Sequence, residues 1–241
     1  MITTLTRPVR LPAALLALAL ALTGTGLAQQ AQPERVAFLG DSMMKLLGHQ
    51  GTREMGKLPG VTVVTNFTSL GSGLARLDAF DWMAKFDTVM RETRPTLVIV
   101  ALGTNDKQPM ATADGRTVRP GEPDWTPEYA RRVGQAMDIL LKGGAARVCW
   151  MELPVMKNPQ HEADAAAIND VVKEQAAARP AVTFFGVRSF LSRKPGEFSK
   201  YMIDATGKPI EFRDVDGVHL TRAGADLVVT KLIAALWPKG G

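Results

Sequence analysis

The sequence holds a single cysteine, Cys149, in a chain of 241 residues. One thiol excludes a disulfide within the chain and a zinc site built from cysteines. Cys149 lies inside the apolar run 147–151, where a structural thiol is more typical than a reactive one. The chain must therefore be stabilised by its hydrophobic core alone, and its length fits one domain with a substantial core.

Long runs of one charge are also absent. Lysine and arginine total 29 against 24 acidic residues, which gives a formal net charge of +5. No stretch concentrates the basic residues, whereas nucleic-acid-binding proteins cluster them on one face or along one helix. The sequence therefore gives little support for a nucleic-acid partner, and a weak preference for anionic polymers or surfaces is all that the charge predicts.

The most continuous apolar segment is at the N-terminus, and its pattern is that of a secretory signal peptide. Two arginines precede the Leu- and Ala-rich stretch 11–22, and the small residues of a cleavage site follow at 26–28. The stretch is shorter than the ~20 residues of a spanning helix, so we favour cleavage over a membrane anchor. We predict a signal peptide at 1–28 and a single domain at 29–241. The mature protein is then periplasmic or secreted, without stable membrane insertion.

Apolar runs alternate with helical patterns along the rest of the chain. Strands are predicted at residues 35–39, 61–66, 96–101, 147–151 and 181–185, and helices at 43–55, 78–93, 126–141, 162–178 and 221–236. Continuously apolar strands that alternate with helices indicate a parallel sheet covered on both faces. The predicted fold class is α/β, a three-layer α/β/α sandwich with a roughly five-stranded parallel sheet. In such folds the site lies beyond the carboxyl ends of the strands.

Two stretches depart from this alternation. Residues 107–125 are polar, rich in Pro and Gly, and too long for an ordinary connection, so we expect a functional or disordered loop. This loop follows the third strand directly and is predicted to fold over the site as a lid. Within residues 188–215, the segments 201–203 and 209–212 flank a turn and predict a small hairpin.

Polar or glycine-rich segments stand at the sheet edge where the site is expected. Gly40-Asp41-Ser42 places a serine at a helix start, where a backbone N–H can face a reacting oxygen. Residues 69–73 allow close approach of backbone amides to a ligand. In residues 103–106, Asn105 can present its side-chain amide as an oxyanion donor. Each segment alone is also compatible with ordinary turn chemistry, so their combination carries the prediction.

Histidine is scarce, which narrows the choice of a catalytic base. The chain has only His49, His161 and His219. The first two lie late in a helix and in a polar stretch, respectively, and are interpreted as surface residues. His219 lies at a strand-to-helix junction, and Asp216 three residues earlier can hold one imidazole nitrogen and leave the other free as a base.

The segments 40–42, Gly73, 103–106 and 216–219 resemble, in this order, the four blocks of the SGNH (GDSL-type) hydrolases. Residues 216–224, 73–78 and 81–82 further resemble a secreted bacterial branch of that superfamily whose substrates are largely undefined. The sequence departs from the pattern in two places. Met43-Met44 replaces the leucine that often follows the serine, and the second block lacks the Asn-x-Gly opening.

The resemblance implies Ser42 as the nucleophile, His219 as the base and Asp216 as its orienting partner. It also implies an oxyanion hole made by the backbone N–H groups of Ser42 and Gly73 and by the Asn105 side chain. Because the second block departs from the family pattern, Gly71 competes with Gly73 as the donor. No cofactor is implied. Three aspartates, Asp41, Asp106 and Asp216, lack the ligand spacing of a metal site, so none is predicted.

Four more side chains are candidate substrate contacts. Arg76 can hold a carboxylate or a sugar hydroxyl, although a solvated helix-start charge is the equal alternative. Asp81 and Trp82 can form a sugar-stacking platform, although core packing is the commoner role of such a tryptophan. Trp125 ends the expected lid.

The predicted activity is that of an exported serine esterase acting on an ester-bearing substrate. An acetylated glycan is the first candidate, because an exported enzyme meets envelope or extracellular polymers. Lipid or aryl esterase activity and acyl transfer on the same triad are alternatives. A catalytically idle glycan-binding or assembly protein is the alternative from another class, because fold alone does not establish activity. The oligomeric state is not predicted.

Overall fold

The computed structural model describes residues 33–204 and 206–238. The predicted signal peptide, residues 1–28, lies outside the described residues. Within the described part of the chain, no helix combines the length and the apolar character needed to cross a bilayer.

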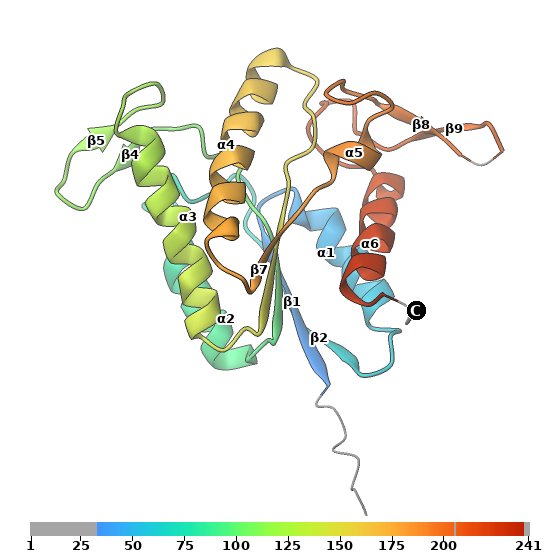
Figure 1. Cartoon of the computed structure of the whole chain (residues 1–241), viewed down its shortest axis with the longest axis horizontal. Coiled ribbons are helices and arrows are strands. Elements are labelled where there is room, and N and C mark those ends of the chain that lie inside the picture. The colour runs from blue at the N-terminus through green and yellow to red at the C-terminus, as the bar shows by residue number, and fades with distance from the viewer. Residues whose placement is uncertain (1–32, 205, 239–241) are drawn as a thin grey trace, which may run out of the picture. The chain divides into compact units, whose positions relative to one another are not determined.

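Five parallel strands form the central sheet, in the order β2-β1-β3-β6-β7 (Figure 1). They are β1 (Glu34–Gly40), β2 (Val61–Thr68), β3 (Leu97–Ala101), β6 (Arg147–Met151) and β7 (Val182–Phe185). The chain runs outward from β1 to β2 and then returns past β1 to β3, so the strand order reverses between β1 and β3. A crevice at the carboxyl ends of the strands is expected at this reversal. The predicted three-layer α/β/α fold is confirmed.

Helices cover both faces of the sheet (Figure 1). One face packs against α1 (Met44–Met55) and α6 (Arg222–Leu236), and the other against α2 (Trp82–Thr93), α3 (Trp125–Lys142) and α4 (Pro159–Ala177). A short helix, α5 (Arg188–Leu191), follows β7.

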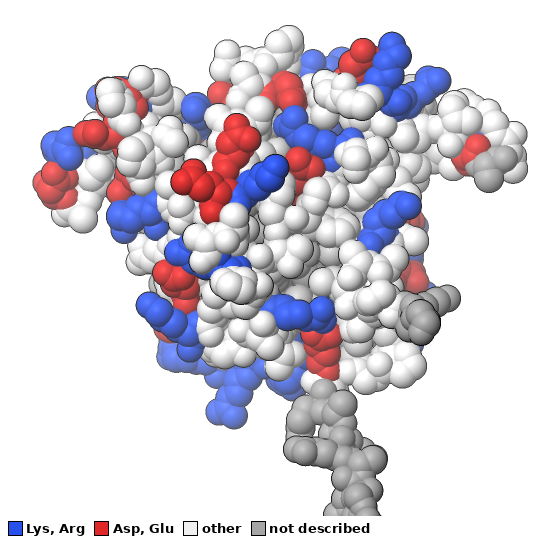
Figure 2. Space-filling model, in the orientation of Figure 1, with Lys and Arg blue, Asp and Glu red and all other residues white. Residues whose placement is uncertain are grey.

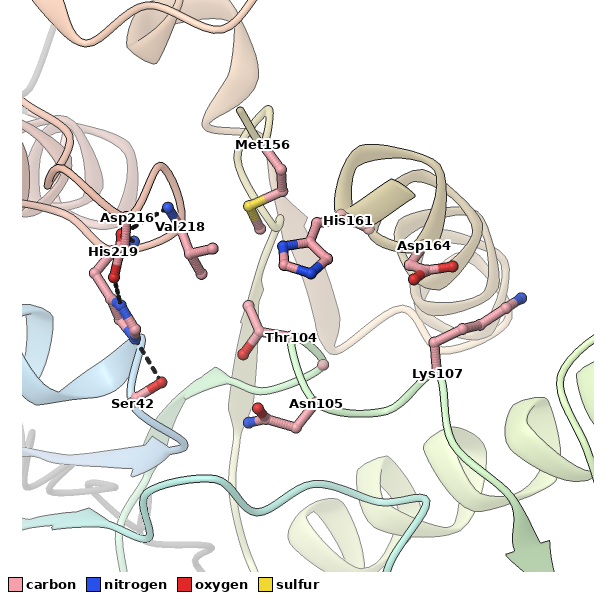
Figure 3. A pocket seen from close by; sticks show the side chains of 12 residues that line it. Ser42, Thr104, Asn105, Lys107, Met156, His161, Asp164, Asp216, Val218 and His219 are labelled. Carbon is pink, nitrogen blue, oxygen red and sulfur yellow. Dashed lines mark hydrogen bonds and ion pairs between the residues drawn. The ribbon is translucent and has the colours of Figure 1, made fainter. Parts of the chain in front are cut away.

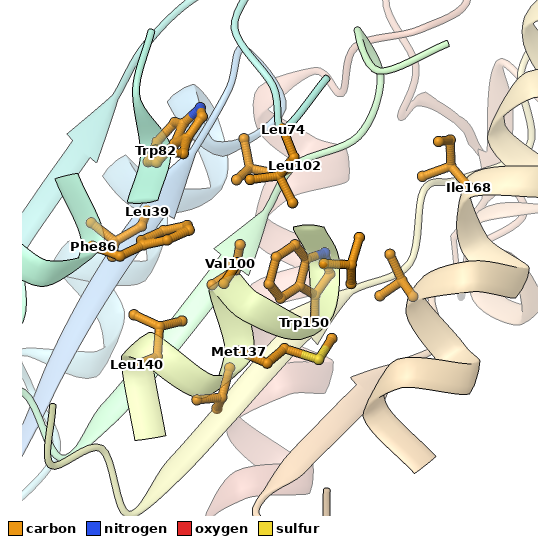
Figure 4. Close-up of a cluster of buried hydrophobic side chains, with 14 of the residues drawn as sticks. Leu39, Leu74, Trp82, Phe86, Val100, Leu102, Met137, Leu140, Trp150 and Ile168 are labelled. Atoms are coloured by element: carbon orange, nitrogen blue, oxygen red, sulfur yellow. The ribbon is translucent and has the colours of Figure 1, made fainter. Parts of the chain in front are cut away.

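Each central strand contributes to two cores, one on each face of the sheet. Leu39 and Val100 pack with Trp150 in the core beneath α2, α3 and α4 (Figure 4). Phe38 and Ile99 pack in the core beneath α1 and α6. Successive side chains of a strand point to opposite faces, so a strand buried on both faces must be apolar at every position. This requirement explains the continuous apolar runs in the sequence.

The short helix α5 was not predicted, and two further departures bear on the site. The helix expected at 78–93 begins at Trp82, because the Asp81 carboxylate accepts the N–H of Ala84 at 3.0 Å and caps the first turn. Residues 107–125 contain an unpredicted hairpin of β4 (Met110–Ala111) and β5 (Thr117–Val118). The predicted second hairpin is present as β8 (Tyr201–Ile203) and β9 (Pro209–Glu211).

The surface carries charges of both signs, interspersed over the face that Figure 2 presents. Some form pairs within one helix, such as Arg91 with Asp87 at 2.9 Å and Arg131 with Glu128 at 2.7 Å. Exposed pairs of this kind contribute about 0–1 kcal/mol each. The stability of the fold therefore resides mainly in its two cores.

Candidate active site

Ser42 lies in the turn between β1 and α1, at the carboxyl edge of the sheet. The carboxylate of the preceding Asp41 is fully buried and accepts hydrogen bonds from the N–H of Met43 and the hydroxyl of Thr104, both at 2.8 Å. It also accepts the N–H of Gly103 at 3.3 Å. Burial raises the pKa of Asp41 to about 6, because the ionised form is deprived of water. Asp41 therefore joins the turn that carries Ser42 to the turn after β3.

Ser42, His219 and Asp216 form a chain of hydrogen bonds (Figure 3). The Nε2 atom of His219 lies 2.7 Å from Ser42 Oγ, and its Nδ1 atom lies 2.6 Å from Asp216 Oδ2. An ionised carboxylate can only accept, so Nδ1 carries the proton and Nε2 accepts the hydroxyl of Ser42. The geometry places a serine O–H against a nitrogen that can take up its proton.

Asp216 is held in its ionised state. Its Oδ1 atom accepts the N–H of Val218 at 2.8 Å and the N–H of His219 at 3.0 Å. Partial burial by itself would raise the pKa of Asp216, but the hydrogen bond with the His219 ring and the two backbone donors lower it to about 2. Asp216 thus remains an acceptor for the imidazole throughout the neutral pH range.

The loop that carries these two residues is held from beneath by a buried arginine. Arg213 is fully buried and donates to the carbonyl oxygens of Val155 at 2.6 Å, Gly217 at 3.1 Å and Val218 at 2.8 Å. Burial lowers the pKa of Arg213 to about 10. The guanidinium therefore fixes the loop before α6 to the segment after β6. Sequence reasoning did not single out this residue.

The turn after β3 also organises the loop after β2. The Asn105 side chain donates to the carbonyl of Ser72 at 2.9 Å. Asp106 is fully buried and accepts the N–H of Ala75 at 2.9 Å and the hydroxyl of Tyr129 at 2.8 Å. Burial raises the pKa of Asp106. The two adjacent side chains thus bring the glycine-containing loop after β2 against the Ser42 turn.

The two competing glycines have different surroundings. Gly73 is buried, and a Cβ atom there would lie 1.9 Å from Asp106 Oδ1, so only glycine fits. Gly71 has φ +68°, and a Cβ atom there would meet nothing within 4 Å. Neither glycine is among the residues that line the hollows beside Ser42. The packing explains why Gly73 is glycine, and the choice of oxyanion donor stays a prediction.

Ser42 and His219 lie between two hollows. The first has a volume of about 310 Å³, and Figure 3 shows Thr104 and Asn105 between the serine and the side chains of α4. Its remaining lining residues are Gly103, Lys107, Met156, His161, Asp164, Ala165, Asp216 and Val218. The second hollow has a volume of about 370 Å³ and is lined, besides Ser42 and His219, by Met43, Lys45, Leu46, Leu70, Asp214 and Leu220.

Both predicted tryptophan contacts are wrong. Trp82 is fully buried in the core, and its indole N–H donates to Ser72 Oγ at 2.9 Å. Trp125 is also buried, stacks on Tyr129 with ring centroids 5.2 Å apart, and donates its N–H to the carbonyl of Gln108 at 2.7 Å. Neither ring offers a free face to a sugar.

The two charged candidates take local partners instead. The Asp81 carboxylate caps α2, as described above. The guanidinium of Arg76 is partly exposed and pairs with Asp78 at 2.7 Å. Arg76 and Asp81 are not among the residues that line either hollow. The structure therefore gives these two side chains no contact with the Ser42 site.

Three side chains of the first hollow were missed by sequence reasoning. His161, interpreted as a surface residue, is exposed but faces the hollow opposite Ser42, with Asp164 and Lys107 beside it (Figure 3). A signal was available, because Asn158-Pro159 marks a helix start after a strand, at the sheet edge where the site was expected. Among the described residues, no group of three or more His, Cys, Asp or Glu side chains is arranged to hold a metal ion.

Solved structures share this fold at low sequence identity. An acetylxylan esterase from Geobacillus stearothermophilus, solved as a catalytic mutant, matches with a TM-score of 0.60 and 15% identity over 86% of this chain and 96% of that chain. A carbohydrate acetylesterase from Sinorhizobium meliloti matches with a TM-score of 0.55 and 16% identity over 85% and 100% of the two chains. A family 3 carbohydrate esterase from Clostridium thermocellum matches with a TM-score of 0.50 and 11% identity over 83% and 93%.

At these identities the likeness shows the fold alone, and it agrees with the predicted three-layer α/β/α sandwich. A search of curated proteins finds no significant match. A family model described as "Protein of unknown function (DUF459)" matches residues 35–235, and the chain belongs to this family.

Proposed function

We propose that the protein is a serine esterase that removes acyl groups, O-acetyl groups first of all, from a carbohydrate. The observation that carries the proposal is the hydrogen-bonded chain Asp216–His219–Ser42, with Asn105 lining the same hollow. A structural serine has no need of an imidazole at 2.7 Å whose other nitrogen is held by an ionised carboxylate.

The proposed reaction is a two-step acyl transfer. His219 Nε2 takes the proton of Ser42 as Oγ attacks the ester carbonyl, and the tetrahedral oxyanion is held by the amide of Asn105 and by backbone N–H groups of Ser42 and Gly73. The protonated imidazole then gives its proton to the departing alcohol. Water repeats the sequence on the acyl-enzyme, which releases the acid and restores Ser42.

The first test is hydrolysis of 4-nitrophenyl acetate by residues 29–241, comparing wild type with Ser42→Ala. Removal of a nucleophile whose triad acts as a unit should lower kcat by at least about 10³-fold. Ser189→Ala is the matched control, because Ser189 is exposed on α5 and lines neither hollow. Equal turnover by wild type and Ser42→Ala would contradict the proposed nucleophile.

Carbohydrate acetates are the first natural substrates to test. Two proteins with this fold are named as a carbohydrate acetylesterase and an acetylxylan esterase. The first hollow, with its Lys, His and Asp side chains, offers hydrogen-bond donors and acceptors to sugar hydroxyls. Release of acetate from acetylated polysaccharides by wild type, and not by Ser42→Ala, is the expected result.

A lipid or aryl esterase is the second candidate, and the second hollow favours it. Met43, Leu46, Leu70 and Leu220 give this hollow an apolar lining next to Ser42. Each buried CH₂ group of an acyl chain would gain about 0.8 kcal/mol there. A series of 4-nitrophenyl esters decides between the two: activity that falls beyond two carbons supports an acetylesterase, and activity that rises to eight carbons supports the lipid reading.

The same triad would transfer the acyl group if a sugar hydroxyl attacked the acyl-enzyme in place of water. Adding an oligosaccharide to the 4-nitrophenyl acetate assay separates the two outcomes, because transfer yields an acetylated sugar that mass spectrometry detects. An idle binding protein would show no turnover of any ester, and Ser42 would resist labelling by an organophosphonate.

We also propose that residues 1–28 direct export and are removed, which would place the enzyme in the periplasm or outside the cell. The support is the order of basic, apolar and small-residue segments. Mass spectrometry of the exported protein should give an N-terminus near Gln29. An intact Met1 in the exported fraction would favour an uncleaved anchor.

A further inference from the structure

The first hollow does not end at the predicted catalytic residues. A third hollow, of about 490 Å³, lies beside it and shares two of its lining residues, Lys107 and Asp164. The third hollow is lined further by Pro120, Gly121, Gln160 and Ala163. One turn of α4 thus forms a wall of both hollows, and the loop after β3 faces it.

Polar side chains on both sides of these hollows have partners in the structure. The Gln160 amide donates to Asp164 Oδ1 at 3.1 Å. The ammonium group of Lys107 lies over the Trp125 ring, 4.3 Å from its centroid, so the buried tryptophan fixes the position of a charge that faces both hollows. Preorganised groups lose less conformational entropy when a ligand binds.

The chemistry of the lining indicates the class of ligand. Lys107 and Asp164 carry opposite charges, and Gln160 adds an amide that both donates and accepts. The other described residues of the third hollow are Pro120, Gly121 and Ala163, which present little apolar area to an acyl chain. The negative charge of the Asp164 carboxylate would repel a polyanion. Paired donors and acceptors without net charge suit the hydroxyl groups of a neutral sugar chain.

We propose that the first and third hollows form one groove that binds a neutral oligosaccharide, with the esterified sugar at Ser42 and the flanking sugars between α4 and residues 120–121. The assignment of the esterified sugar rests on the proposed function. The flanking subsite rests on Gln160, Asp164 and Lys107 and can be tested without catalysis.

The experiment measures binding of unesterified xylo-oligosaccharides of one to four sugars to the Ser42→Ala protein by calorimetry. We expect Kd to fall as the chain lengthens from one to three sugars. The double variant Gln160→Ala/Asp164→Ala, in the same Ser42→Ala background, should bind the four-sugar chain about tenfold more weakly, as expected for a lost hydrogen bond to a charged group. Asp170→Ala is the matched control, because Asp170 is exposed on the same helix and lines neither hollow.

Several results would contradict the proposal of a single oligosaccharide-binding groove. They are a Kd that does not depend on chain length, absence of binding at every length, and equal binding by the double variant and the Asp170→Ala control. Tighter binding of tetragalacturonate than of the neutral four-sugar chain would also overturn it. If the Ser42→Ala protein binds the neutral chain in this length-dependent way but the wild type hydrolyses no ester, the groove proposal stands and the proposed esterase activity is wrong.

Discussion

The two halves of the site are held in place by buried groups of opposite charge. In the half formed by the turns after β1 and β3, the buried carboxylates of Asp41 and Asp106 collect N–H and O–H donors. In the half formed by the loop before α6, the buried guanidinium of Arg213 collects carbonyl oxygens. Ser42 and Asn105 belong to the first half, and His219 belongs to the second.

The difference follows from what each half must present. A turn at the end of a parallel strand has free N–H groups, which a buried acceptor can bind from beneath. The loop before α6 turns its N–H groups toward Asp216, so its carbonyls are left inward and need a donor. One planar guanidinium with five N–H bonds can serve several carbonyls at once. Each half is therefore organised independently of the hydrogen bond between Ser42 and His219, which joins the two halves.

Removing the buried guanidinium of the second half should have the largest effect on stability and turnover. Arg213→Met leaves the carbonyls of Val155, Gly217 and Val218 without their buried donor. We expect a loss of about 4 kcal/mol in the free energy of unfolding, because each buried carbonyl left without a donor costs about 1–3 kcal/mol. Turnover of 4-nitrophenyl acetate should also fall at least tenfold, because the His219 ring loses its fixed position. Urea denaturation and steady-state kinetics measure the two losses.

Two further variants serve as controls for Arg213→Met. Arg213→Lys keeps the charge and part of the hydrogen bonding, and should recover part of both losses. Arg193→Met removes an exposed arginine and should change stability by no more than about 0.5 kcal/mol. If Arg213→Met lost stability but kept the kcat and the pH profile of wild type, Arg213 would hold the fold without positioning the base.

In the first half, Asn105→Ala tests whether the amide acts on the reaction. An oxyanion donor is needed mainly in the transition state, so kcat should fall by about 10²–10³-fold while KM changes little. The same substitution also frees the carbonyl of Ser72, which should cost about 1 kcal/mol of stability. If the variant unfolds more easily but keeps its kcat, Asn105 holds the loop after β2 and does not act on the reaction.

Asp41 gives the first half a pH dependence of stability between about pH 4 and pH 6. Its pKa is about 6 in the folded protein against an ordinary value of 3.8, so between these pH values the folded state holds a proton that the unfolded state has released. Stability must therefore fall as the pH rises through this window. Two units of pKa amount to about 3 kcal/mol. Asp216 is lowered to about 2 and titrates below the window.

The measurement compares wild type with Asp41→Asn by urea denaturation at pH 4 and pH 7. The asparagine does not titrate, so the stability of wild type relative to the variant should decrease by about 2.5 kcal/mol from pH 4 to pH 7, because part of the unfolded chains are already ionised at pH 4. A constant difference between the two proteins at both pH values would mean that Asp41 is ionised throughout. Its four donors, the N–H groups of Met43 and Gly103, the Thr104 hydroxyl and the Asn105 amide, would then stabilise the charge.

The sequence predicted the fold and the residues at strand ends for a common reason. Apolar runs locate parallel strands, and parallel strands end at one edge, so Ser42, Asn105 and His219 were expected together before any distance was known. Arg213 was not predictable in this way. Its partners are backbone carbonyls, which every residue has, and such contacts leave no pattern of side chains along the chain.

The misplaced aromatic residues have a different cause. Trp82 and Trp125 stand next to polar residues in the sequence, and local polarity does not tell which way a large ring turns. Both rings begin helices and turn inward, Trp82 over Phe86 and Trp125 over Tyr129, because burying an aromatic ring contributes more than a surface contact. His161 shows the reverse case, since an exposed residue at a helix start faces the site.

The smallest expected effect distinguishes a core tryptophan from a substrate contact. Trp125→Phe keeps the stacking on Tyr129 but removes the N–H bond to the carbonyl of Gln108, which should lower the free energy of unfolding by about 1 kcal/mol. The ring would still lie beneath the Lys107 ammonium, over a weaker cation–π partner. KM for acetylated sugars should therefore rise by less than about threefold, within the range of one weakened exposed contact. A rise of tenfold or more in KM, without a change in stability, would instead place Trp125 in contact with the substrate.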